Sequence, residues 1–132
     1  GFALIDKRRP KPNEAKVAHI VGDLKNKHVI VIDDMIDTAG TICNAASTAM
    51  GQNAKSVIAV GTHPVLSGES INRLMDSPIN KVIVCNTIHV PKEKQFEKLE
   101  IISVGHVFAE AIKHVTEGTS LSSMFSNENN KG

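Results

Sequence analysis

The chain has 132 residues, of which 41% are hydrophobic and 22% are charged, so it can build the core of one globular domain or part of one. A formal net charge of only +1 gives no sign of a nucleic-acid partner, and four Phe residues without Trp or Tyr argue against a base-stacking surface. No apolar run reaches the roughly 20 residues that span a bilayer, and no signal-peptide pattern opens the chain, so we expect a cytoplasmic protein with no membrane partner.

Two strands joined by a polar loop are expected at the start of the chain. The segments Phe2 to Ile5 and, more weakly, Val17 to Val21 favour strands, whereas prolines interrupt the segment between them. This loop carries four cations in five positions, which are Lys7, Arg8, Arg9 and Lys11. Such a cluster is a solvated loop or a generic anion patch when taken alone. Next to a strand, it can also fold over the phosphates of a nucleotide.

The most informative segment runs from Val29 to Thr41 and reads V-I-V-I-D-D-M-I-D-T-A-G-T. Its first four residues form an apolar run without alternation, which predicts a strand buried on both faces. Apolar residues then recur at helical spacing and predict a helix from Ala39 to Met50. Thr38 to Thr41 therefore lies between the carboxyl end of a strand and the amino end of a helix.

This turn is suited to a phosphate group. The first main-chain N–H groups of a helix have no partner within it, and the positive end of the helix dipole attracts an anion. Gly40 allows close approach of the backbone, and the hydroxyls of Thr38 and Thr41 add donors. The alternative is that Thr38 or Thr41 simply caps the helix.

The three aspartates of the segment require a different ligand. Asp33, Asp34 and Asp37 would repel a phosphate, so they need hydroxyl groups, N–H groups or a cation. A ribose 5-phosphate satisfies both parts of the segment, because its phosphate fits the turn while its 2′- and 3′-hydroxyls, with or without Mg²⁺, reach the acids. A generic phosphate site without ribose and acids that merely solvate the strand end are the other interpretations.

The remaining elements continue an alternation of strands and helices. We expect strands over Ser56 to Gly61, Lys81 to Cys85 and Glu100 to Ser103, and helices over Ser70 to Met75 and Val107 to Val115. This order predicts an α/β fold with a mainly parallel sheet flanked by helices. Cys43 and Cys85 lie outside any C-x-x-C spacing and are expected to be buried, reduced thiols, while Ser67-Gly68 before a helix binds an anion or caps that helix.

Several motifs resemble one family and occur in its order. The D-D-M-I-D-T-A-G-T run is similar to the ribose-5-phosphate loop of type I phosphoribosyltransferase-fold proteins, and the chain resembles the ribose-phosphate pyrophosphokinases, or phosphoribosyl pyrophosphate synthetases. The other matching motifs are D-K-R-R-P, I-V-G-D, T-H-P-V-L-S-G and the terminal S-L-S-S-M-F. The resemblance implies a Rossmann-like, type I phosphoribosyltransferase fold. It implies that residues 1–125 are the carboxyl-terminal domain without its first strand and helix or the amino-terminal domain, and that 126–132 is a polar tail.

The resemblance also implies a reaction, in which pyrophosphate passes from ATP to the 1-hydroxyl of ribose 5-phosphate and gives phosphoribosyl pyrophosphate and AMP. This chain would supply the ribose-phosphate site and the cationic loop, with little or no turnover by itself. A nucleobase phosphoribosyltransferase and a non-catalytic, synthetase-associated regulatory subunit are the alternatives. A homo-oligomer, commonly a hexamer, and a regulatory phosphate or ADP site are implied as well.

The roles implied for individual residues follow the matching motifs. Lys7 and Arg9 would act in catalysis, Arg9 also on the ribose phosphate. Asp33 and Asp34 would hold the ribose hydroxyls, Asp33 also Mg²⁺, and Asp37 to Thr41 would bind the sugar phosphate. The full ribose-5-phosphate set is Arg9, Asp33, Asp34, Asp37, Thr38, Ala39, Gly40 and Thr41. The effector set is Ser120, Ser122 and Phe125, for which a plain surface turn is the alternative.

Overall fold

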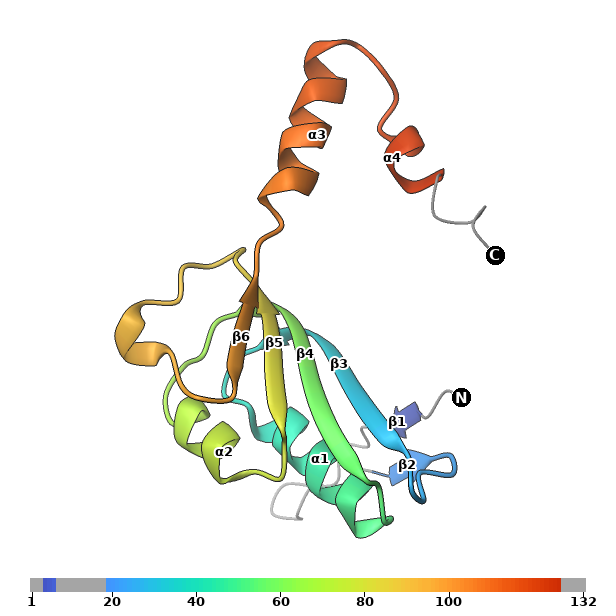
Figure 1. The fold of residues 1–132 in the computed structure, drawn as a ribbon, viewed down its shortest axis with the longest axis vertical. Helices are drawn as coiled ribbons and strands as arrows, with labels where there is room; N and C mark the ends of the chain where they lie inside the picture. Colours follow the sequence, from blue (N-terminus) through green and yellow to red (C-terminus); the bar gives the residue numbers. More distant parts are fainter. Residues whose placement is uncertain (1–3, 7–18, 127–132) are drawn as a thin grey trace. The chain divides into compact units, whose positions relative to one another are not determined.

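The computed structural model describes residues 4–6 and 19–126, and Figure 1 shows its ribbon. The chain divides into two compact units, Gly1–Ile102 and Ser103–Gly132.

A four-stranded parallel sheet forms the centre of the first unit. Its strands are β3 (His28–Ile36), β4 (Ser56–Pro64), β5 (Lys81–Cys85) and β6 (Leu99–Ile102), and they lie side by side in chain order. Two short strands, β1 (Leu4–Asp6) and β2 (His19–Val21), form a separate antiparallel pair. The predicted α/β class with a mainly parallel sheet is confirmed.

Helices α1 (Gly40–Gly51) and α2 (Ser70–Asp76) lie on the same face of this sheet, and a short 3₁₀ helix, η1 (Lys92–Lys94), precedes β6 (Figure 1). The register places Val31, Ala59 and Val82 next to one another on that face, so their side chains meet the helices. Ala45, Ala46 and Ala49 of α1 are buried against them. Because alanine is small, the helix axis can approach the sheet closely.

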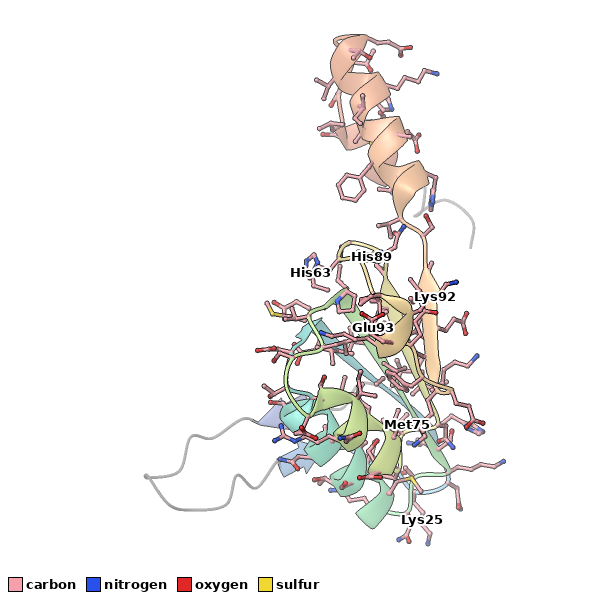
Figure 2. All side chains as sticks on the ribbon, turned by 90° about the vertical axis from the view of Figure 1, so that its left-hand side faces the viewer. Lys25, His63, Met75, His89, Lys92 and Glu93 are labelled. Atoms are coloured by element: carbon pink, nitrogen blue, oxygen red, sulfur yellow. The ribbon has the colours of Figure 1, made fainter. Side chains whose placement is uncertain are left out.

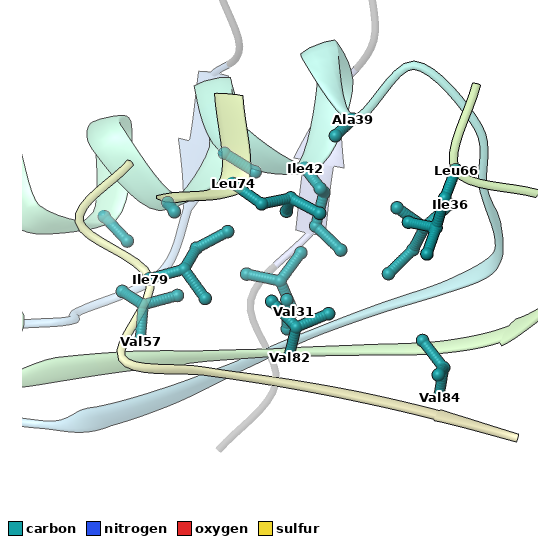
Figure 3. Close-up of a cluster of buried hydrophobic side chains, with 14 of the residues drawn as sticks. Val31, Ile36, Ala39, Ile42, Val57, Leu66, Leu74, Ile79, Val82 and Val84 are labelled. Atoms are coloured by element: carbon teal, nitrogen blue, oxygen red, sulfur yellow. The ribbon is translucent and has the colours of Figure 1, made fainter. Parts of the chain in front are cut away.

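The core lies between the sheet and the two helices (Figure 3). Leu74 joins it from α2, and Ile42 joins it from the first turn of α1. Lys98, just before β6, closes the carboxyl end of α2 by donating to three main-chain oxygens, those of Met75 at 2.7 Å, Ser77 at 3.0 Å and Leu74 at 3.3 Å. A lysine in this place satisfies carbonyls that have no partner within the helix.

Strand β3 differs from its prediction in length and in burial. It continues through Asp33 and Asp34 to Ile36, so these two acids lie within the strand and not after it. Ile30 and Ile32 are 61% and 75% exposed, so the expectation of a strand buried on both faces is wrong. The physical reason is that, among the described residues of this unit, both α-helices cover the opposite face.

The second unit consists of α3 (Gly105–Thr116) and α4 (Ser122–Ser126). The first of these was predicted two residues shorter at its start, whereas the second was not predicted. A side-chain contact of 2.6 Å between His114 Nδ1 and Thr119 Oγ1 joins the last turn of α3 to the segment after it. Within the described residues, none of the helices is both long and apolar enough to cross a membrane.

Candidate functional site

The predicted phosphate turn lies where β3 ends and α1 begins. Residues 37–39 form bends between the strand and the helix. The loop that follows β4 passes beside this turn, since Leu66 donates its N–H to the Ile36 oxygen at 3.0 Å. Figure 3 shows Ile36, Leu66 and Ala39 close together at this end of the core. The site is thus built at the carboxyl ends of two neighbouring parallel strands, the usual position of a ligand crevice in such sheets.

The helix α1 starts without a side-chain cap. Its N-cap is Ala39, which has a left-handed backbone with φ of 61°, and the first helical bond runs from the Cys43 N–H to the Ala39 oxygen at 3.0 Å. The alternative in which Thr38 or Thr41 caps the helix is therefore wrong. No acidic residue occupies the first turn, so the positive end of the helix dipole is not neutralised there.

Ala39 has an unusual conformation for an alanine. The left-handed region costs a residue with a Cβ about 1–3 kcal/mol, and such residues persist only where their surroundings hold them. Its side chain is buried, with 5% exposure, so the core anchors the turn from inside. The turn is therefore held in a shape that an unconstrained chain would rarely adopt.

A side chain of α2 anchors the same turn from outside. Arg73 Nη1 donates to the main-chain oxygen of Thr38 at 2.9 Å. The Cys43 thiol in turn donates to the Arg73 oxygen at 3.5 Å, and burial raises the pKa of that thiol. Cys43 and Cys85 are both free and half-buried, so the prediction that they are buried is met only in part.

The acids are spread around the end of β3. Asp33 is half-buried and accepts the Asp34 N–H at 3.0 Å, whereas Asp34 and Asp37 are exposed. Adjacent residues of an extended strand point to opposite faces, so the side chains of Asp33 and Asp34 lie on opposite sides of β3 at the edge of the sheet. A ligand lying across this edge, and not on one face, would be within reach of both carboxylates.

The loop after β4 supplies a contact that the sequence did not assign. The Ser67 hydroxyl donates to the Asp37 carboxylate, and the Ser67 N–H donates to the Asp37 main-chain oxygen at 3.1 Å. Neither predicted role of this serine, as an anion ligand or a helix cap, describes this contact. The two residues lie 30 positions apart, and only the parallel pairing of their strands brings them together.

His63 lies at the same end of the sheet (Figure 2). Its Nδ1 is 2.9 Å from Thr87 Oγ1, and that hydroxyl donates to the Thr62 oxygen at 3.0 Å. These contacts join the ends of β4 and β5, so this histidine helps to shape the loop region. Among the described residues, no group of three or more His, Cys, Asp or Glu side chains could hold a metal ion.

Other predicted residues lie elsewhere. Lys7 and Arg9 fall outside the described residues. Ser120, Ser122 and Phe125 belong to the second unit, where Ser120 Oγ accepts the Ser122 N–H at 3.2 Å at the start of α4. Within the first unit, the other residues of the predicted set follow one another along β3, the turn and the start of α1, and Ser67 and Arg73 contact this turn.

The chain is similar in sequence and in structure to several known proteins. Ribose-phosphate pyrophosphokinases of Aquifex aeolicus (strain VF5) and Bacillus subtilis (strain 168) are each 50% identical over 125 residues, which cover 95% of this chain and 40% and 39% of those proteins. The crystal structure of phosphoribosylpyrophosphate synthetase from Mycobacterium smegmatis matches 88% of this chain and 37% of its own, with a TM-score of 0.79 and 38% identity.

The chain thus spans about two fifths of the length of these curated relatives. The model of one protein family, described as the phosphoribosyl synthetase-associated domain, matches residues 5–126. That match covers nearly the whole chain and includes every element described above except the first residue of β1. The chain therefore belongs to the phosphoribosyl synthetase-associated domain family.

Proposed function

We propose that this chain provides the ribose-5-phosphate site for the ATP-dependent synthesis of phosphoribosyl pyrophosphate, with release of AMP. The observation that carries the proposal is the uncapped start of α1 behind Ala39, shortly after a strand that carries Asp33 and Asp34 near its carboxyl end. An uncapped helix start whose dipole no acidic residue neutralises favours phosphate, while carboxylates on the preceding strand favour hydroxyl groups. The names of the relatives support this reaction over a nucleobase phosphoribosyltransferase or a non-catalytic subunit.

Each part of the turn has a distinct role in this proposal. The 5-phosphate lies against the main chain from Asp37 to Thr41, where the Thr38 and Thr41 hydroxyls are exposed. The ribose hydroxyls face Asp33 and Asp34 across the edge of the sheet. Asp37, held by Ser67, orients the sugar next to the phosphate.

We assign Lys7 and Arg9 to the charge that develops during pyrophosphate transfer, with Arg9 also on the ribose phosphate. The family match begins at residue 5 and so includes both side chains, which supports the assignment. Reactions of this kind gain most of their rate from alignment and from cationic groups near the transferred phosphates. In this arrangement the turn fixes the acceptor, and the cationic loop acts on the donor.

Magnesium fits the proposed site only together with a substrate. Mg²⁺ commonly binds one or two protein carboxylates and completes its shell with water and substrate oxygens. Asp33 offers such a carboxylate, and the described residues hold no larger cluster that could bind the ion alone. When bound, Mg²⁺ would neutralise charge on the substrates, while Asp33 and Asp34 orient the sugar.

The rest of a longer protein would complete the reaction. The chain covers about two fifths of the length of its relatives. From the family resemblance, we propose that it is the carboxyl-terminal part of a synthetase whose other part supplies most of the ATP site. Residues 1–125 would form one phosphoribosyltransferase-like domain and 126–132 a tail. A homo-oligomer, hexameric by resemblance, would place Ser120, Ser122 and Phe125 at a regulatory phosphate or ADP site.

Binding measurements on the 132-residue chain test the first step. Titration calorimetry with Mg²⁺ should detect ribose 5-phosphate, and ribose without its phosphate should bind much more weakly. Asp33→Asn should weaken the binding of ribose 5-phosphate but leave the thermal midpoint nearly unchanged, since Asp33 lies at the rim of the core. Equal affinities for ribose and ribose 5-phosphate would contradict the role of the turn.

A further inference from the structure

We infer that Arg73 is a positioning residue that sets the shape of the phosphate turn without touching the substrate. The inference rests on the proposed function, since it names a further determinant of the same site. Its main observation is the 2.9 Å hydrogen bond from Arg73 Nη1 to the main-chain oxygen of Thr38, across 35 positions of sequence. The same nitrogen lies 3.9 Å from the point where a Cβ on Gly40 would be, so the guanidinium lies close to both Thr38 and Gly40.

The bond fixes one peptide plane of the turn. Because a trans peptide is planar, its C=O and N–H groups point in opposite directions. When Arg73 draws the Thr38 carbonyl towards α2, the N–H of Ala39 in the same plane must point away from α2. A carbonyl turned towards the ligand would repel a phosphate, whereas an N–H turned that way would bind it.

The left-handed backbone of Ala39 explains why the turn needs such a contact. A residue with a Cβ relaxes out of this conformation unless its neighbours prevent it. The buried methyl group of Ala39 restrains the residue itself, and Arg73 restrains the peptide that precedes it. Together they fix the turn before binding, and this lowers the entropy lost when a phosphate is bound.

Arg73 is itself attached to a rigid part of the fold. Its N–H bonds to the Glu69 oxygen at 3.0 Å within α2, and its own oxygen accepts the Cys43 thiol from α1. The next residue, Leu74, is fully buried in the core. The guanidinium therefore extends from a fixed base, which is the condition for positioning another group accurately.

Lys98 offers a matched control for this role. It is also a cation that donates to main-chain oxygens near α2, but its three acceptors lie at the carboxyl end of that helix. Removing Lys98 should therefore weaken the fold without altering the turn. Removing Arg73 should alter the turn without weakening the fold.

The experiment compares Arg73→Met, Arg73→Lys and Lys98→Met in the 132-residue chain, with calorimetry of ribose 5-phosphate and thermal unfolding of each variant. Arg73→Met should weaken binding about tenfold or more, the usual effect of losing one hydrogen bond from a charged donor. Arg73→Lys, which keeps a charged donor, should recover most of this loss. Lys98→Met should lower the thermal midpoint and keep the affinity within about twofold of the parent.

Two results would overturn the inference while the parent chain still binds ribose 5-phosphate. The first is an Arg73→Met variant with unchanged affinity. The second is a loss of affinity that scales with the thermal midpoint in all three variants, because this would reveal a structural role only. If the parent chain fails to bind ribose 5-phosphate, the proposed function itself fails, so the two failures are distinguishable.

Discussion

Gly61 stands opposite Asp33 where β4 and β3 pair, and it leaves space for one side chain of the core. A Cβ at this position would lie 2.6 Å from Ile36 Cγ1 and 2.8 Å from Ile36 Cδ1. Atoms of a packed core cannot approach so closely, so either Ile36 or the strand would have to move. Since Ile36 directly precedes the phosphate turn, such a movement would reach the site.

We therefore expect Gly61→Ala to destabilise the fold by about 1–3 kcal/mol, the usual cost of overpacking. Urea unfolding measures this change. Gly51→Ala is the matched control, because a Cβ on Gly51 at the end of α1 meets nothing within 4 Å. That control should be neutral or slightly stabilising, since alanine favours a helix more than glycine does. Equal stability of the two variants would show that Ile36 can move to make room for the new methyl group with little loss of free energy.

The serines at the two ends of α2 differ in whether their hydroxyl groups have a hydrogen-bond partner. Ser70 Oγ is fully buried and has no hydrogen-bond partner among the described residues. Ser77 Oγ, in contrast, donates to the Leu74 oxygen at 2.7 Å and accepts the Ile79 N–H at 3.3 Å. Burying an unpaired hydroxyl costs free energy, whereas a paired one contributes to stability.

Ser70→Ala should therefore leave the free energy of unfolding unchanged or raise it, by up to about 1–3 kcal/mol. Ser77→Ala should lower it by about 1 kcal/mol through the loss of its two bonds. Denaturant unfolding of both variants decides between these signs. A clear loss of stability in Ser70→Ala would indicate that its hydroxyl has a partner after all.

At the scale of elements, the site depends on how the segment after β3 is joined to the loop after β4. The backbone bonds from Leu66 and Ser67 to Ile36 and Asp37 hold the two segments together. The Ser67 hydroxyl adds a bond to the Asp37 carboxylate, which restricts its rotation. The backbone thus provides the junction, and the side chain provides the orientation of the acid.

Ser67→Ala should consequently reduce the affinity for ribose 5-phosphate severalfold while changing the stability by less than about 1 kcal/mol. Calorimetry and thermal unfolding of one preparation measure both. Ser47→Ala on the exposed side of α1 is a suitable control, and its affinity should match the parent. A Ser67→Ala variant with parental affinity would argue against an orienting role for Asp37.

The sequence predicted an element correctly where the residues of that element alone determine it, and failed where tertiary packing or a very short length is decisive. Helical spacing of apolar residues located α1, and the run from Lys81 to Cys85 matched β5 at both ends. The prediction that Ile30 and Ile32 are buried was wrong, because the tertiary arrangement decides which face of a strand other elements pack against. The five-residue α4 in a serine-rich segment was missed, since so short a helix carries no periodicity.

The same distinction applies to the site. The turn from Asp37 to Thr41 could be predicted because acids, glycine and hydroxyls lie together in the sequence. Ser67 and Arg73 could not, because they reach the turn from 30 and 35 positions away and only the packing of β4 and α2 brings them there. The resemblance to known synthetases assigned functions to the turn and the cationic loop, but it assigned none to the contacts of Ser67 and Arg73 with the turn.

At the scale of the whole molecule, binding and turnover should separate. The chain covers about two fifths of the length of its relatives. In the proposed function, the remaining part of a longer protein supplies most of the ATP site. We expect the purified 132-residue chain to bind ribose 5-phosphate and to form little or no AMP from ATP and ribose 5-phosphate. Chromatographic quantification of AMP measures this, with a full-length synthetase as the positive control. Robust AMP formation by the chain alone would show that it holds a complete donor site.

The order of the strands has a consequence for how the site arises during synthesis. The four strands of the parallel sheet lie in space in the order in which they occur in the chain, and the contacts of the phosphate turn come from residues between Asp33 and Arg73. A chain made from its amino end therefore holds all of these residues once α2 has been completed, before β5 and β6 exist. The later strands then add core to a turn whose contacting residues are already present.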